Sequence, residues 1–145
     1  MNKIEAWLKE HKITEVECMV SDLTGIARGK IAPTMKFISE KGMRLPESIL
    51  LQSVTGDYVE DEIYYDLLDP ADIDMICKPD DSAIYLVPWA LEPTAQIIHD
   101  CYDKTGEPIE MSPRNHSPST PPTSSTRCSK TCTTGAKPRA WIWIR

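Results

Sequence analysis

The residue types that most often carry chemistry are scattered along this chain of 145 residues. Its three histidines, His11, His99 and His116, are far apart in sequence, and His99 stands in an alternating apolar pattern. We therefore expect His99 to be a core or surface histidine rather than a metal ligand. The stretch "TGIARGK" lacks the spacing of a phosphate-binding loop and has no hydroxyl residue after its lysine. The sequence predicts neither a catalytic residue nor a metal site of its own.

Cysteines and acidic residues are the other two groups that could bind a metal. Cys128 and Cys132 form one C-x-x-x-C without a second pair, which is weak support for zinc. The acidic stretch 57–74 lacks the glycine of an EF-hand loop, and we interpret it as a solvated loop. The other cysteines stand singly in apolar surroundings typical of free buried thiols: Cys18, Cys77 and Cys101.

Charge is distributed unevenly along the chain. The net charge of −6 argues against a nucleic-acid partner, which normally meets a basic surface. Residues 116–145 hold five Lys or Arg and no Asp or Glu, so residues 1–115 hold the other 11 basic residues and all 22 acidic ones. The first residues are charged and amphipathic, and no apolar run is long enough to span a membrane. We expect a cytoplasmic protein without a membrane partner.

Hydrophobic periodicity predicts the secondary structure. Ile4, Trp7 and Leu8 have helical spacing, whereas Val16, Cys18 and Val20 alternate as in a half-buried strand. The predicted elements are a helix at 2–12, a hairpin over 13–33, a helix at 33–42, a loop over 43–71, three strands at 72–79, 82–90 and 94–103, and a helix beginning at Ser112. This order, without a βαβ repeat, predicts an α+β domain.

Four stretches carry a resemblance to a known family: "VECMVSDLTGIARGKIAPT", "KGMRLPESILLQSVTGDY", "IYYDLLDPADIDMICKPD" and "VPWALEPTAQIIHDCYDKTGEPIEMSPRN". Together they resemble the N-terminal β-grasp domain of the glutamine synthetase superfamily, over residues 3–115. The nearest branch is the γ-glutamylputrescine synthetase-like ligases, which join glutamate to an organic amine. The resemblance implies a β-grasp-like mixed sheet with one or two short helices.

The resemblance also implies a reaction. Enzymes of the family use ATP to phosphorylate the glutamate side-chain carboxylate, and an amine then displaces the phosphate. ATP and the Mg or Mn ions are held by a C-terminal catalytic domain that has no counterpart here. We therefore expect an N-terminal fragment of an ATP-dependent glutamate–amine ligase that binds no cofactor and is inactive alone. In the family, this domain closes the active site of a neighbouring subunit in a ring, so other synthetase subunits are the expected partners.

The segment "RLPESIL" is where the resemblance implies site residues. Ammonia-using relatives have Asp-Gly-Ser-Ser there, and Leu45 stands in the place of the Asp while Glu47 and Ser48 take the two Ser positions. We expect Glu47 and Ser48 to lie in a substrate-side loop that completes a neighbouring subunit's site. An apolar Leu45 would suit the methylenes of an alkylamine. The alternative is that Glu47 is an ordinary surface residue.

A composition change divides the chain into a β-grasp domain at 1–112 and a Ser/Thr/Pro-rich basic tail at 113–145. We expect the tail to be disordered, and we interpret it as an aberrant segment produced by a frameshift or truncation. The alternative is a natural disordered tail, which the composition also permits. A second hypothesis for the whole chain is a non-catalytic β-grasp module that binds full-length synthetase subunits.

Overall fold

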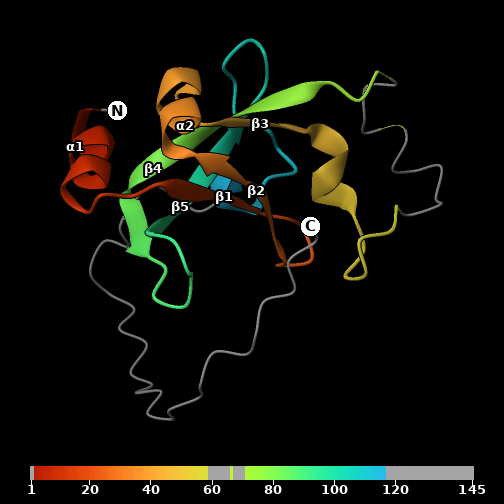
Figure 1. The fold of residues 1–145 in the computed structure, drawn as a ribbon. Coiled ribbons are helices and arrows are strands. Elements are labelled where there is room, and N and C mark those ends of the chain that lie inside the picture. The colour runs from red at the N-terminus through yellow and green to blue at the C-terminus, as the bar shows by residue number, and fades with distance from the viewer. Residues whose placement is uncertain (1, 59–65, 67–70, 117–145) are drawn as a thin grey trace, which may run out of the picture.

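The computed structural model describes residues 2–58, 66 and 71–116 (Figure 1). The regular elements among them follow one another as α1 (Asn2–Glu10), β1 (Glu15–Ser21), β2 (Ala27–Pro33), α2 (Thr34–Glu40), β3 (Met43–Pro46), the 3₁₀ helix η1 (Glu47–Leu51), β4 (Asp74–Leu86), β5 (Thr94–Tyr102) and the 3₁₀ helix η2 (Pro113–His116).

The strands form one five-stranded mixed sheet in the order β2-β1-β5-β4-β3. The central neighbours β1 and β5 run parallel, and each of the other neighbouring pairs is antiparallel. Figure 1 shows α2 lying across the sheet, with α1 beside it near one end. The predicted α+β class, with a mixed sheet and two short α-helices, is confirmed.

One face of the sheet carries the hydrophobic core. Alternate residues of the two central strands are fully buried on this face, and both helices pack against them. The side chains that make this contact are Val16, Cys18, Ala95, Ile97 and Cys101 from the strands and Ile4, Leu8 and Phe37 from the helices. The burial of this apolar surface is the main favourable contribution to folding.

The predicted strands at 72–79 and 82–90 are a single strand, β4. The Asp-Asp-Ser sequence between them makes a bulge, which shifts the register with β5 between Pro79 and Ile84. Asp80 accepts hydrogen bonds from the amide and the hydroxyl of Ser82, so its side chain organises the bulge locally. The prediction was wrong because these polar residues are typical of turns as well as of bulges.

The predicted loop over 43–71 contains a further strand, β3, paired with β4 at the sheet edge. β3 has only four residues, which are too few to show the two-residue alternation of a strand in the sequence, although Met43 and Leu45 are both buried. The Thr34 hydroxyl does not cap α2. Pro33 is the cap residue, and the Thr34 hydroxyl instead donates to the Ile13 carbonyl at 2.8 Å, which ties α2 to the start of β1.

The segment after β5 folds back onto the sheet and ends in η2, where the sequence predicts a helix start. Arg114 donates to Asp100 and to Asp80 at 2.7 Å each. The Asn115 side-chain amide donates to the carbonyls of Cys101 and Ile109. These contacts anchor the segment to β4 and β5. The expected tail beyond it lies outside the described residues, and the boundary at residue 112 stays a prediction.

His99 is a core histidine, fully buried on β5 with its ring edge against Phe37. Its Nδ1 lies 2.9 Å from the Ile97 carbonyl, whereas no hydrogen bond of normal geometry reaches Nε2 among the described residues. Burial lowers the pKa of His99 to about 4, against smaller opposing contributions from the backbone of Ile97 and Met19 and from the Asp100 charge.

This buried imidazole predicts a loss of stability in mild acid. The unfolded chain takes up the proton near an ordinary histidine pKa of about 6.5, and the folded protein only near about 4. The contribution of neutral His99 to the free energy of unfolding should therefore be fully present above about pH 6.5. About 3 kcal/mol of it should be lost as the pH drops to about 4. Urea titrations of the wild type and of His99→Leu test this, because the variant should lack that part of the pH dependence. Identical pH slopes would contradict the assignment.

Candidate functional site

The turn of the β1–β2 hairpin is organised by a buried carboxylate. Asp22 is fully buried, and its Oδ1 accepts hydrogen bonds from the Thr24 amide at 2.9 Å, the Thr24 hydroxyl at 2.8 Å and the Ile26 amide at 2.8 Å. Gly25 completes the turn with a φ of 78°, in the left-handed region that glycine adopts without strain. The residues Asp22, Thr24 and Gly25 therefore have a structural role.

Arg28 connects this turn to the segment that follows η1. Its Nε donates to Asp22 Oδ2 at 2.7 Å, and its Nη2 donates to the Ser53 carbonyl at 2.6 Å. The Leu23 amide donates to the Leu50 carbonyl at 3.2 Å. The hairpin turn and η1 are thus joined by one buried ion pair and its hydrogen bonds.

The predicted site residues Glu47 and Ser48 occupy the first turn of η1. Ser48 is buried, and its hydroxyl donates to Asp72 Oδ2 at 2.9 Å while its amide donates to Asp72 Oδ1 at 3.2 Å. Glu47 is half-buried, and its amide donates to the Ile73 carbonyl at 3.3 Å. Asp72 therefore caps the start of η1, and Ser48 donates the two hydrogen bonds that bind its carboxylate.

The structure places Leu45 differently from the expected amine-facing position. Leu45 lies in β3 opposite Met75, and its side chain belongs to the domain's own core. Its apolar character is therefore explained by core packing, and the interpretation of Leu45 as a contact for an alkylamine is wrong. The alternation along β3 directs this side chain inward.

The described residues contain no group of three or more His, Cys, Asp or Glu side chains able to hold a metal ion. His11 follows the end of α1 and His99 lies on β5, whereas Cys128, Cys132 and most of the acidic stretch 57–74 fall outside the described residues. Within the same part of the chain, no helix has both the length and the apolar character needed to cross a membrane.

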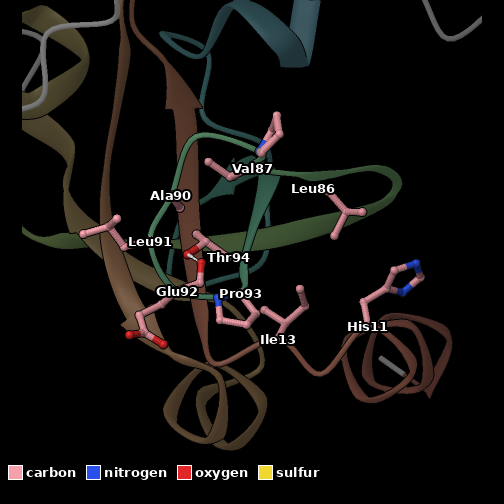
Figure 2. A pocket seen from close by; sticks show the side chains of 10 residues that line it. His11, Ile13, Leu86, Val87, Ala90, Leu91, Glu92, Pro93 and Thr94 are labelled. Atoms are coloured by element: carbon pink, nitrogen blue, oxygen red, sulfur yellow. Dashed lines mark hydrogen bonds between the residues drawn. The ribbon is translucent and has the colours of Figure 1, made fainter.

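A shallow pocket of ≈ 290 Å³ lies between the end of α1 and the β4–β5 loop, away from η1 (Figure 2). Figure 2 shows His11 on one side and Pro93 with the loop residues on the other. The lining is mostly apolar, and the Thr94 hydroxyl is engaged with the Glu92 carbonyl at 2.9 Å. The sequence does not reveal this pocket because "VPWALEP" has no period that distinguishes it from a turn.

Comparisons with known proteins agree with the resemblance. The chain is 29% identical over 115 residues to a glutamate–isopropylamine ligase of Pseudomonas sp, a match that covers 78% of this chain and 25% of that protein. It is 30% identical over 117 residues to lengsin of Canis lupus familiaris, which covers 79% of this chain and 20% of lengsin. No protein-family model matches the chain.

Solved structures show the same fold. The complex of GmaS with ADP superposes with a TM-score of 0.59 at 20% identity, over 79% of this chain and 23% of that one. GmaS without ligand gives a TM-score of 0.55. This chain belongs to the glutamine synthetase superfamily and matches its N-terminal region. It spans a quarter or less of the length of these curated relatives, 25% and 20%.

The buried ion pair predicts a large effect of removing the cation alone. Arg28→Ala leaves the Asp22 carboxylate buried without its partner, which should cost about 3–5 kcal/mol of unfolding free energy. The matched control is Lys36→Ala, because Lys36 pairs with Glu40 on the exposed face of α2 and should contribute no more than about 0.5 kcal/mol. Urea denaturation of both variants measures the difference. Equal losses would show that the pair does not hold the turn.

The cap of η1 predicts a graded response at Asp72. Asp72→Ala removes both acceptors from Ser48 and should lose about 1–2 kcal/mol of unfolding free energy. Asp72→Asn keeps one acceptor oxygen and tolerates the left-handed φ of 43°, so it should lose clearly less. Thermal or urea unfolding measures both, and equal losses in the two variants would speak against this cap.

Proposed function

We propose that this chain is the N-terminal region of an ATP-dependent ligase that joins glutamate to an organic amine. The observation that carries the proposal is the likeness to glutamate–isopropylamine ligase over 115 residues. ADP bound to GmaS is consistent with a nucleotide-using relative. In this proposal, ATP and Mg or Mn bind to the catalytic part of the enzyme rather than to the residues described here.

The contribution of this region is to complete a site on a neighbouring subunit of a ring-shaped homo-oligomer. Glu47 is the residue we assign to that role, and its carboxylate would hold the distal ammonium of an amine substrate. Two features support the assignment. Glu47 begins η1, and η1 is fixed from both ends, by Asp72 at Ser48 and by Leu23 at Leu50. A protein side chain binds a substrate group most effectively when its own position is already fixed before the substrate arrives.

The proposal also includes the finer predictions drawn from the sequence. The chain alone is inactive in this proposal, because the resemblance assigns ATP and the metal ions to the catalytic part of the enzyme. The substrate class is an alkylamine such as putrescine or isopropylamine. A cytoplasmic location is supported by the free state of Cys18, Cys77 and Cys101, since disulfides are rare in reducing compartments.

A second candidate function is a non-catalytic β-grasp module that binds full-length synthetase subunits. The observation that favours it is the self-contained core, in which both helices and the central strands share one buried cluster. Such a module would fold and bind without carrying out the reaction.

A coupled assay of ADP release tests whether the chain alone lacks ligase activity. The purified chain, supplied with glutamate, ATP, Mg²⁺ and either putrescine or isopropylamine, should release ADP no faster than the assay without protein. Addition of the chain to the full-length glutamate–isopropylamine ligase, followed by size-exclusion chromatography, tests the second candidate. Turnover by the chain alone would overturn its assignment as a non-catalytic region, and co-elution would favour the binding module.

A further inference from the structure

Cys77 and Cys101 face each other across the β4–β5 pair. They are direct partners in the antiparallel register, and both side chains are fully buried on the core face of the sheet. Both thiols are free. Neither has a part in the proposed function, which leaves two thiols side by side without an assigned role.

The backbone contacts show which kind of cross-strand pair this is. The Cys101 carbonyl accepts from the Ile109 amide at 3.1 Å and from Asn115, so it points away from β4. The Cys77 carbonyl faces β3, where it would lie 2.4 Å from a Cβ atom added to Gly42. Because both carbonyls turn outward, this is a non-hydrogen-bonded pair, in which Cα atoms approach to about 4.5 Å and side chains are closest. That separation lies within the range of about 4.4–6.8 Å for disulfides.

The two thiols differ in acidity. A hydrogen bond from the Cys77 thiol lowers the pKa of Cys101, with further help from the Ser112 hydroxyl and against the effect of burial. The same hydrogen bond, together with burial, raises the pKa of Cys77. Cys101 is therefore the better nucleophile, and Cys77 retains its proton until a second step.

We propose that Cys77 and Cys101 form a redox-active dithiol that a small-molecule disulfide oxidises to a cross-strand disulfide. The Cys101 thiolate attacks one sulfur of the oxidant, breaking its S–S bond and releasing one thiol. Cys77 then loses its proton and attacks the Cys101 sulfur of the mixed disulfide, which releases the second thiol. The protein loses two S–H bonds and gains one S–S bond, and the oxidant is reduced to two thiols.

Access to this pair is controlled by the segment that follows β5. Ile109 is buried in the core, and its amide donates to the Cys101 carbonyl at 3.1 Å. Arg114 fastens the segment through its ion pairs with Asp80 and Asp100. A small oxidant therefore reaches the thiols when this segment lifts, so the rate of oxidation should depend on Arg114.

Cys18 provides a matched control within the same core. It lies on β1 opposite Ile97 of β5, so the sheet register does not pair it with Cys77 or Cys101. Burial raises the pKa of its thiol to about 12, with a small opposing contribution from Lys30. Cys18 should stay reduced when the other two are oxidised.

Oxidation of the full chain by glutathione disulfide, followed by alkylation of free thiols and peptide mapping, tests the proposal. Chymotrypsin cuts after Tyr85 and after Trp89, between the two cysteines, so only a disulfide can keep the two peptides together. We expect a linked Cys77–Cys101 peptide pair, alkylated Cys18, and the same link when Cys128 and Cys132 are both replaced by Ser. Alkylation of both Cys77 and Cys101 at saturating oxidant, or linkage of either to another cysteine, would overturn the proposal.

The rate of the same reaction tests the role of the covering segment. Arg114→Ala should accelerate formation of the Cys77–Cys101 link several-fold, whereas Lys36→Ala should leave the rate unchanged because Lys36 lies on α2 in an exposed pair. Circular dichroism of each variant before oxidation confirms that the comparison is made between folded proteins. Equal rates in Arg114→Ala and the wild type would overturn the assignment of this segment as the barrier.

Discussion

Parallel pairing of β1 with β5 at the centre of the sheet is the constraint on which the rest of the domain depends. The register joins Glu15 to Thr94 and Met19 to Ile98, across most of the described chain. Joining segments so distant carries an entropic cost that only extensive burial can offset. Val16, Cys18, Ala95 and Ile97 supply that burial, since each is fully enclosed. Because parallel strands need a long crossover, the intervening chain also carries α2 and η1 with it.

The buried pair of Asp22 and Arg28 extends this constraint to the candidate site. A buried ion pair often adds little net stability, since the cost of desolvating two charges offsets their attraction. It does penalise any arrangement in which either partner is left alone. Arg28 also donates to the Ser53 carbonyl, which joins the hairpin turn to the residues after η1. The hydrogen bond from the Leu23 amide to the Leu50 carbonyl joins the same turn to η1 itself. The position of Glu47 thus depends on contacts made by residues that have no catalytic chemistry.

Local patterns predict those parts of the fold that depend on local periodicity. The alternation of Val16, Cys18 and Val20 predicts β1, and the helical spacing of Ile4 and Leu8 predicts α1. The short strand β3 and the continuous strand β4 are not predicted, because each is defined by its pairing with a distant strand. Pairing registers depend on contacts between segments far apart in sequence, which a local window does not contain.

The candidate site divides in the same way. By itself the sequence predicted the hairpin over 13–33 and the lack of a phosphate-binding loop, and its resemblance to the family put forward Glu47 and Ser48 as candidate site residues. Only the tertiary structure decided that Ser48 caps against Asp72, that Leu45 faces the core and that His99 is buried without a full set of hydrogen bonds. It also brought Cys77 opposite Cys101. The physical reason is that a side chain's partners follow from strand register and burial, which are properties of the assembled sheet rather than of any one segment.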